Sequence, residues 1–154
     1  MLQKDDVFRR EQSLIIVSIL TVFVWHIMFL SKLNLIPDEC SYWAWSRHLD
    51  WSYFDNSGMT AYLIRFSTEI FGRSTPFTVR FPFLVSALIT TLLVYSSAAL
   101  ASDSHRVGAY SALFFNLAPL SLLAAGAAVH DNSLIMFWAL ALWSTIKFIK
   151  TENP

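Results

Sequence analysis

The chain has 154 residues, enough for one ordinary domain, and 55% of them are hydrophobic while only 14% are charged, against about 25% charged residues in soluble globular proteins. Eleven basic and eleven acidic side chains cancel, so no overall field favours nucleic acid as a partner. The composition excludes a soluble enzyme and a disordered chain, and the single cysteine excludes an internal disulfide framework or a cysteine-based zinc site.

Four apolar stretches predict membrane-spanning helices, at residues 14–30, 78–100, 108–129 and 134–149. The first ends in bulky residues rather than a cleavage site, which favours an uncleaved helix over a signal peptide. Its His26 is expected to hydrogen-bond to a neighbouring helix. The third carries Asn116, Pro119 and a patch of small residues, typical of a helix packed against other helices. We therefore expect an all-α integral membrane protein with about four transmembrane helices, forming one module over residues 1–154.

The distribution of basic residues predicts the orientation of this module. Short segments at one end of the predicted spans are rich in them: Lys4, Arg9, Arg10, Arg106, Lys147 and Lys150. The long loop at residues 31–77 has a lower density of basic residues, and the turn at 130–133 has none. Because basic loops stay in the cytoplasm, we expect both termini to be cytoplasmic and both of these loops to lie outside the cytoplasm, in a multi-pass protein of the inner or plasma membrane.

The loop at residues 31–77 is predicted to contain two interfacial helices. Asp38 is placed to cap a helix over residues 38–50, in which Tyr42 and Trp45 share a face. A second helix is expected over residues 59–71, with Met59, Tyr62, Leu63, Phe66 and Ile70 on one face. Aromatic rings with polar tips are typical of helices lying at the level of the lipid headgroups.

Residues 36–82 also carry a family resemblance. The matching residues occur in order and at matching intervals: Asp38, Glu39, Tyr42, Trp43, Trp45, Ser46, Tyr53, Phe54, Asp55, Ile64, Arg65, Phe71, Gly72, Val79, Arg80 and Pro82. This string resembles the first extracytoplasmic loop of the C-type glycosyltransferases that use polyprenyl-phosphate sugars. The branch is the one with the lipid A aminoarabinose and galacturonic acid transferases, and the protein O-mannosyltransferases are more distant relatives.

The resemblance continues through the turn His130-Asp131-Asn132-Ser133-Leu134 and covers nearly the whole chain from residue 13. The chain departs from the family at residues 56–58, which read Asn-Ser-Gly where His-Pro-Pro is frequent, and at 129–130, which read Val-His in place of Thr-Pro. It corresponds to the N-terminal part of much longer enzymes. The resemblance implies transfer of a sugar from a polyprenyl-phosphate donor to a lipid or other cell-envelope acceptor.

The resemblance implies roles for three acids. Asp38 stands where the family has its catalytic base, Glu39 would orient the acceptor or bind a divalent cation, and Asp131 matches a third catalytic acid. The ordinary local roles of these residue types offer simpler accounts: Asp38 and Asp131 as helix caps, and Glu39 as a solvated acid in the first turn of a helix.

Other residues are candidates for substrate binding: Asp55, Arg65, Arg80, Tyr42 and Trp45. Asp55 is equally explained as a turn former, Arg65 as half of a surface pair with Glu69, and Arg80 as a side chain reaching the membrane surface. The aromatic residues are equally explained as interface anchors. His130 is a weak candidate for a metal ligand, the alternative being a solvated loop histidine.

The expected partners are the polyprenyl-phosphate sugar, the lipid or envelope acceptor and membrane lipid, with a second chain completing the helical bundle. Because a transition state needs groups on both sides of the transferred sugar, we expect the isolated chain to be inactive. The alternative function is that of a non-catalytic remnant, or of a membrane subunit that packs against another chain.

Overall fold

The structure is a computed structural model that describes residues 2–54 and 56–152. These residues form seven helices, which confirms the all-helical prediction, and no strand beyond a single bridge between Ser52 and Ser57. The helices are α1 (Leu2–Leu30), α2 (Pro37–Arg47), α3 (Met59–Ile70), α4 (Pro76–Ser102), α5 (His105–Leu117), α6 (Pro119–Ala124) and α7 (His130–Glu152).

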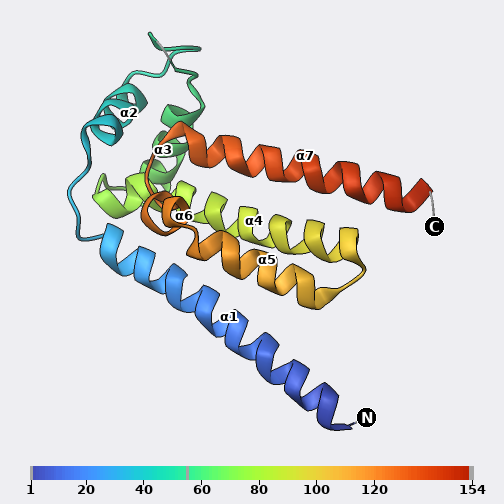
Figure 1. Cartoon of the computed structure of the whole chain (residues 1–154). Helices are drawn as coiled ribbons and strands as arrows, with labels where there is room; N and C mark the ends of the chain where they lie inside the picture. The colour runs from blue at the N-terminus through green and yellow to red at the C-terminus, as the bar shows by residue number, and fades with distance from the viewer. Residues whose placement is uncertain (1, 55, 153–154) are drawn as a thin grey trace.

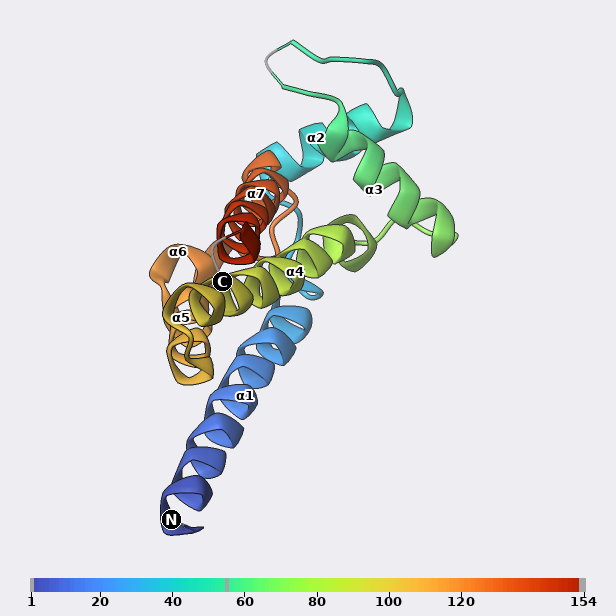
Figure 2. The ribbon, with the colours of Figure 1, turned by 90° about the vertical axis from the view of Figure 1, so that its right-hand side faces the viewer.

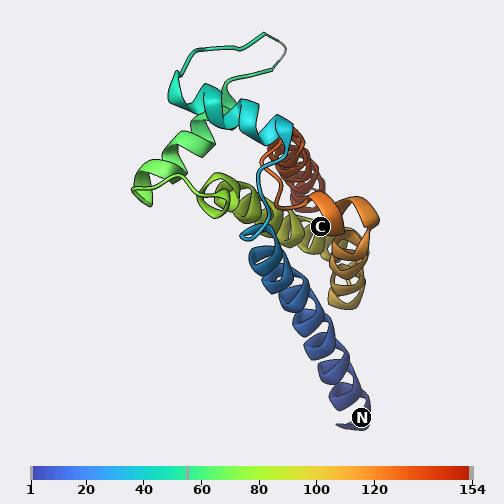
Figure 3. The same cartoon turned by 90° about the vertical axis from the view of Figure 1, so that its left-hand side faces the viewer.

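Helix α4 lies at the centre of the arrangement and contacts α1, α3, α5 and α7 (Figure 1). Helices α4 and α5 form an antiparallel hairpin, α7 packs on another side of α4, and α1 crosses α4 and α5 obliquely (Figures 1 and 2). Helices α2 and α3 lie beyond one end of α4, whereas both termini lie toward the opposite end (Figures 1 and 3). The long loop and the start of α7 are therefore on the same side of the molecule.

Polar side chains join the helices across this bundle. His26 Nε2 lies 2.8 Å from the Leu122 carbonyl oxygen, so the predicted hydrogen bond to a neighbouring helix is confirmed. Asn116 Nδ2 donates to Thr91 Oγ1 at 3.1 Å and joins α5 to α4. Since lipid offers these groups no partner, such bonds fix how the helices pack.

Two helices of the described chain, α4 and α7, are long and apolar enough to cross a membrane, and the apolar part of α1, Ile15–Leu30, is shorter. Among the residues of α7, large apolar side chains are exposed, including those of Leu134, Trp138, Leu142 and Phe148. An apolar surface of this size needs lipid or another chain to cover it. The fold is consistent with a membrane protein. Of the four predicted spans, those at residues 78–100 and 134–149 lie in helices that are long and apolar enough to cross a membrane.

The prediction of one continuous helix over residues 108–129 is wrong. Helix α5 ends at Leu117, Ala118 is extended at φ −58° and ψ 135°, and α6 begins at Pro119. Pro119 makes a break possible here, because proline lacks an N–H to continue the α5 ladder and disfavours helical geometry in the residue before it. A non-helical segment at residues 125–129 follows, and α7 then begins at His130, four residues before the predicted start.

The two loop helices occur close to their predicted positions, with two differences. Ile36 is the N-cap of α2, so Asp38 is not the cap, and the N–H of Ile36 is satisfied by the Glu39 carboxylate at 3.0 Å. Helix α3 buries a face made mostly of small and polar residues, and its predicted apolar face points outward, with Phe66 64% and Ile70 65% exposed.

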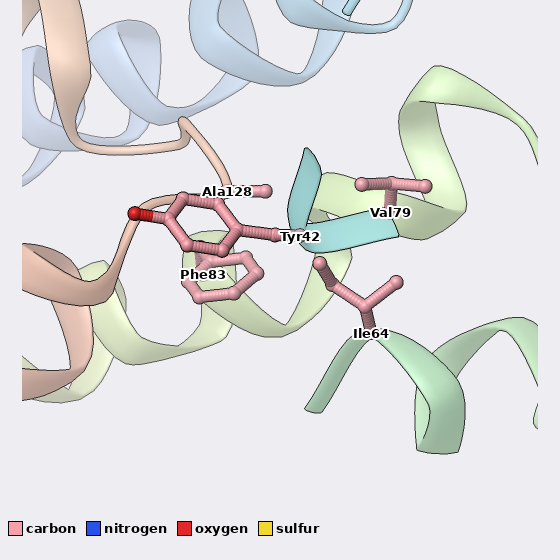
Figure 4. Packing of buried hydrophobic residues seen from close by; sticks show 5 residues of the cluster. All are labelled: Tyr42, Ile64, Val79, Phe83 and Ala128. Carbon is pink, nitrogen blue, oxygen red and sulfur yellow. The ribbon is translucent and has the colours of Figure 1, made fainter. Parts of the chain in front are cut away.

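A small core joins these loop helices to the bundle. Figure 4 shows its five buried residues, which come from α2, α3, α4 and the segment before α7: Tyr42, Ile64, Val79, Phe83 and Ala128. The backbones approach closely beside it, because a Cβ added at Gly126 would collide with the side chains of Leu30 and Leu84. Only glycine fits there without moving its neighbours.

A buried ion pair lies next to this core. The guanidinium of Arg80 donates from Nε to Glu39 Oε1 at 2.8 Å and from Nη2 to Glu39 Oε2 at 2.5 Å. Its other N–H groups donate to the carbonyl oxygens of Leu30, Leu33 and Asn34. Arg80 is only 2% exposed, so the alternative that its side chain reaches the membrane surface is wrong.

We expect Arg80→Met to lower the free energy of unfolding by about 3 to 5 kcal/mol, because it leaves the Glu39 carboxylate buried without its cation. Adding Glu39→Gln should restore part of this loss, since the buried charge is then removed while a carbonyl oxygen remains for the backbone donors. Denaturant unfolding in detergent micelles, followed by circular dichroism, measures both. The exposed Arg65→Met is the control and should cost less than about 1 kcal/mol; equal losses at positions 65 and 80 would contradict the prediction.

Candidate functional site

Asp38 lies at the exposed start of α2, one residue after the proline that begins the helix. It lines an open cavity of about 510 Å³ together with Ser41, Tyr42, Trp45, Asn56 and His130. Within the part of the chain that the structure describes, its carboxylate has no hydrogen-bond or ion-pair partner. We call this the Asp38 cavity, and its one acid is free to act on a bound group.

Aromatic side chains form one wall of the Asp38 cavity. The Trp45 ring stacks on Tyr53 with ring centres 4.6 Å apart, and meets Tyr42 edge to face at 5.3 Å. Tyr53 is itself fixed, because its hydroxyl lies 3.0 Å from the Trp45 carbonyl oxygen and 2.9 Å from that of His48, and accepts from the Asp50 N–H at 3.1 Å. The wall is held rigidly, which suits stacking against a sugar ring or packing against an isoprenoid chain.

His130 connects the cavity to the third predicted acid. Its Nδ1 shares a hydrogen bond of 3.0 Å with the Tyr42 hydroxyl, and its Nε2 lies 3.3 Å from Asp131 Oδ1. Asp131 lies in the first turn of α7 and lines an adjoining cavity of about 320 Å³ with Asn116 and Asn132. The structure thus brings Asp38, His130 and Asp131 to one region, from segments more than ninety residues apart.

The Glu39 side chain does not line the Asp38 cavity but is buried between helices. It is 0% exposed, and besides Arg80 its carboxylate accepts from the backbone N–H of Ile36 at 3.0 Å and of Ala128 at 2.8 Å. Both oxygens are occupied and neither lines the Asp38 cavity. These contacts hold the start of α2 against α4 and against the segment before α7.

The remaining predicted site residues lie elsewhere. Arg65 pairs with Glu69 at 2.5 Å, which is the surface pair given above as the alternative to substrate binding. It lines a different cavity. Arg80 is buried with Glu39, and Asp55 lies outside the described residues. Two cavity residues were not predicted: Ser41, which its spacing of three from Asp38 on α2 would have revealed, and Asn56, for which the sequence carries no signal.

The described residues do not fit a divalent metal site. Among them there is no group of three or more histidine, cysteine, aspartate or glutamate side chains placed to hold a metal ion. The two weak candidates have other contacts, since Glu39 binds Arg80 and two backbone N–H groups, and His130 contacts Tyr42 and Asp131.

The environment of Glu39 determines its charge. Burial raises the pKa of its carboxyl, but hydrogen bonds from Arg80, Ala128 and Ile36, together with the positive charge of Arg80, outweigh burial and hold the pKa below its ordinary value near 4.5. A carboxyl whose pKa is lower in the folded state stabilises the fold fully at pH values above the unfolded-state pKa. That stability is lost as the pH falls through the folded-state pKa.

We therefore expect the unfolding temperature to fall as the pH drops below about 4.5, and to fall less steeply in Glu39→Gln, which has no carboxyl to protonate. Thermal unfolding in detergent at a series of pH values from neutral to strongly acidic measures this. Glu69→Gln removes an exposed acid and serves as the matched control, and its pH dependence should follow the wild type. An unchanged slope in Glu39→Gln would show that this carboxyl does not control acid stability.

Comparison with known proteins adds independent findings. The sequence model of dolichyl-phosphate-mannose-protein mannosyltransferases matches residues 55–154. The lipid A galacturonosyltransferase RgtD of Rhizobium johnstonii is 32% identical over 59 residues, which are 37% of this chain and 12% of that protein. The chain therefore spans only a small part of this relative. No solved structure matches it.

Proposed function

The chain belongs to the dolichyl-phosphate-mannose-protein mannosyltransferase family, and on this premise we propose that it is the N-terminal membrane module of a C-type glycosyltransferase. The enzyme would move a sugar from a polyprenyl-phosphate donor to a lipid or other cell-envelope acceptor. The observation that carries the proposal is the Asp38 cavity, which is lined by aromatic side chains and by an exposed carboxylate that has no partner among the described residues. A lipid acceptor is supported by the galacturonosyltransferase relative, whose name gives lipid A as its acceptor.

In the proposed reaction Asp38 is the general base. Its carboxylate takes the proton of an acceptor hydroxyl, the hydroxyl oxygen forms a bond to the anomeric carbon of the sugar, and the bond from that carbon to the phosphate oxygen breaks. The polyprenyl phosphate leaves with the electron pair. The exposed position at the start of α2 suits this role, because a base must come within hydrogen-bond reach of the proton that it accepts.

The other cavity residues have supporting roles in the proposal. Trp45 and Tyr42 bind the sugar or the isoprenoid chain, and Tyr42 also fixes the His130 ring through their hydrogen bond. Asp131 lies 3.3 Å from His130 Nε2 and, in the proposal, orients the imidazole at the edge of the cavity. Glu39 and Arg80 are positioning residues, since both are buried and bound to each other.

The competing function is that of a non-catalytic membrane subunit or remnant. The observation that favours it is the largely exposed apolar surface of α7, which a second chain would cover as well as lipid does. The two proposals differ at Asp38, because a subunit that only packs against another chain does not need this carboxylate.

We expect Asp38→Asn to lower turnover by on the order of a hundredfold or more in an enzyme that carries this segment, the usual scale for the loss of a positioned base. Transfer from a radiolabelled polyprenyl-phosphate sugar to envelope lipid, in proteoliposomes, measures it. Asp50→Asn is the control: Asp50 is an exposed acid of the same loop that does not line the cavity, and its removal should leave the rate within a few-fold. Near-normal transfer by Asp38→Asn would favour the subunit.

The proposed topology places the loop at residues 31–77 outside the cytoplasm and both termini inside. In a Cys40→Ser background, Ser57→Cys should react with a membrane-impermeant maleimide in intact cells, because Ser57 is exposed in that loop. Ser102→Cys, exposed at the other end of α4, should react only after lysis. Labelling of Ser102→Cys and protection of Ser57→Cys in intact cells would reverse the proposed orientation.

A further inference from the structure

Three arginine side chains line another cavity, away from Asp38. It has a volume of about 470 Å³ and lies between the end of α2, the last turn of α3 and the turn that leads into α4. Arg47, Arg65 and Arg73 line it, with Thr68, Glu69 and Ser74. We call this the arginine cavity, and the proposed sugar transfer assigns it no role.

The arginine cavity carries a net positive charge. Glu69 is the one acid among its lining residues, and it lies 2.5 Å from Arg65 Nε. With three cations and one anion, the lining residues sum to +2, in a chain whose own net charge is zero. Ser74 adds a hydroxyl group to the same space, whereas the Thr68 hydroxyl donates to the Arg65 carbonyl oxygen at 3.1 Å. Arginine and hydroxyl donors around an open cavity are the groups that bind a phosphate.

The position of the arginine cavity relates it to the membrane. Arg73 and Ser74 come directly before Thr75, the N-cap of α4, which is one of the two helices able to cross a membrane. A group at the entry of a spanning helix lies at the depth of the lipid headgroups. Figure 3 shows the turn between α3 and α4 on the side of the molecule away from the start of α7.

An apolar surface adjoins the arginine cavity. At 100° per residue, Arg65 and Glu69 border the stripe on α3 that contains Tyr62, Phe66 and Ile70. These three side chains are 40%, 64% and 65% exposed. A cationic cavity at the edge of an exposed apolar stripe matches an amphiphile whose phosphate enters the cavity and whose acyl chains cover the stripe.

We propose that the arginine cavity binds the headgroup phosphate of an anionic phospholipid and so anchors the external loop at the membrane surface. This site is distinct from the Asp38 cavity, since Arg47 and Asp38 lie at opposite ends of α2, about 13 Å apart along the helix axis. The proposal does not depend on glycosyl transfer. It depends on α4 crossing the membrane.

The test measures lipid binding by the full chain in a neutral detergent. Short-chain phosphatidylglycerol, short-chain phosphatidylcholine and inorganic phosphate are titrated separately, with retained lipid counted by native mass spectrometry and affinity measured by thermophoresis. We expect phosphatidylglycerol to bind, and Arg47→Gln/Arg73→Gln to weaken its binding about 25-fold, at about fivefold for each basic side chain removed. Lys32→Gln/Arg106→Gln removes the same charge elsewhere and should change affinity less than threefold.

Glu69→Gln provides a test of opposite sign. It removes the only acid that lines the arginine cavity, so phosphatidylglycerol affinity should rise by about fivefold. Because Glu69 is exposed, this variant folds even if the double arginine variant does not. A fall or no change in affinity in Glu69→Gln would overturn the proposal. Equal binding of phosphatidylcholine, or inorganic phosphate binding as tightly as phosphatidylglycerol, would also overturn a site for anionic phospholipid.

Discussion

The ion pair between Arg80 and Glu39 determines how the loop at residues 31–77 packs against the helices. Arg80 enters the fold near the start of α4, and its guanidinium reaches the end of α1, the start of α2 and, through Glu39, the segment before α7. Two charges in a dry interior are costly unless every donor and acceptor is matched. Here the carboxylate accepts from the guanidinium and from two backbone N–H groups, so the pair can persist only when the four segments have this arrangement.

Because of this constraint, the neighbouring acids Asp38 and Glu39 have different environments. Successive residues of a helix differ in direction by about 100°, so anchoring Glu39 in the interior turns Asp38 outward. The same anchoring brings Tyr42 against His130 and closes one side of the Asp38 cavity. A buried carboxylate that is bound to an arginine cannot take up a proton from a substrate at neutral pH, whereas an exposed one without a partner can. In the proposed mechanism the fold thereby gives Glu39 a structural role and its neighbour Asp38 a chemical one.

The two cavities share one end of the molecule but differ in character. The Asp38 cavity combines an acid with stacked aromatic rings, and the arginine cavity combines cations with a hydroxyl group beside an apolar stripe. Helix α3 produces this second surface because its small and polar residues pack inward, among them Thr60, Ala61 and Ser67. Small side chains allow close approach between helices. The larger apolar residues of α3 consequently remain exposed, and in the proposed anchoring they are the ones that lipid covers.

The sequence by itself determined the helical class, the two loop helices and the family, because each rests on local periodicity, on composition or on an ordered string of residues. It also predicted which acids gather at one end of the molecule, since turns joining antiparallel helices alternate between ends. Tertiary structure alone decided which of Asp38 and Glu39 is buried. Both side chains at the start of a helix can be solvated, and Glu39 becomes buried only because it pairs with Arg80, forty-one residues later in the chain. Tertiary structure also decided that Pro119 ends α5 rather than bending a longer helix, since that choice depends on whether neighbouring helices satisfy the freed backbone groups.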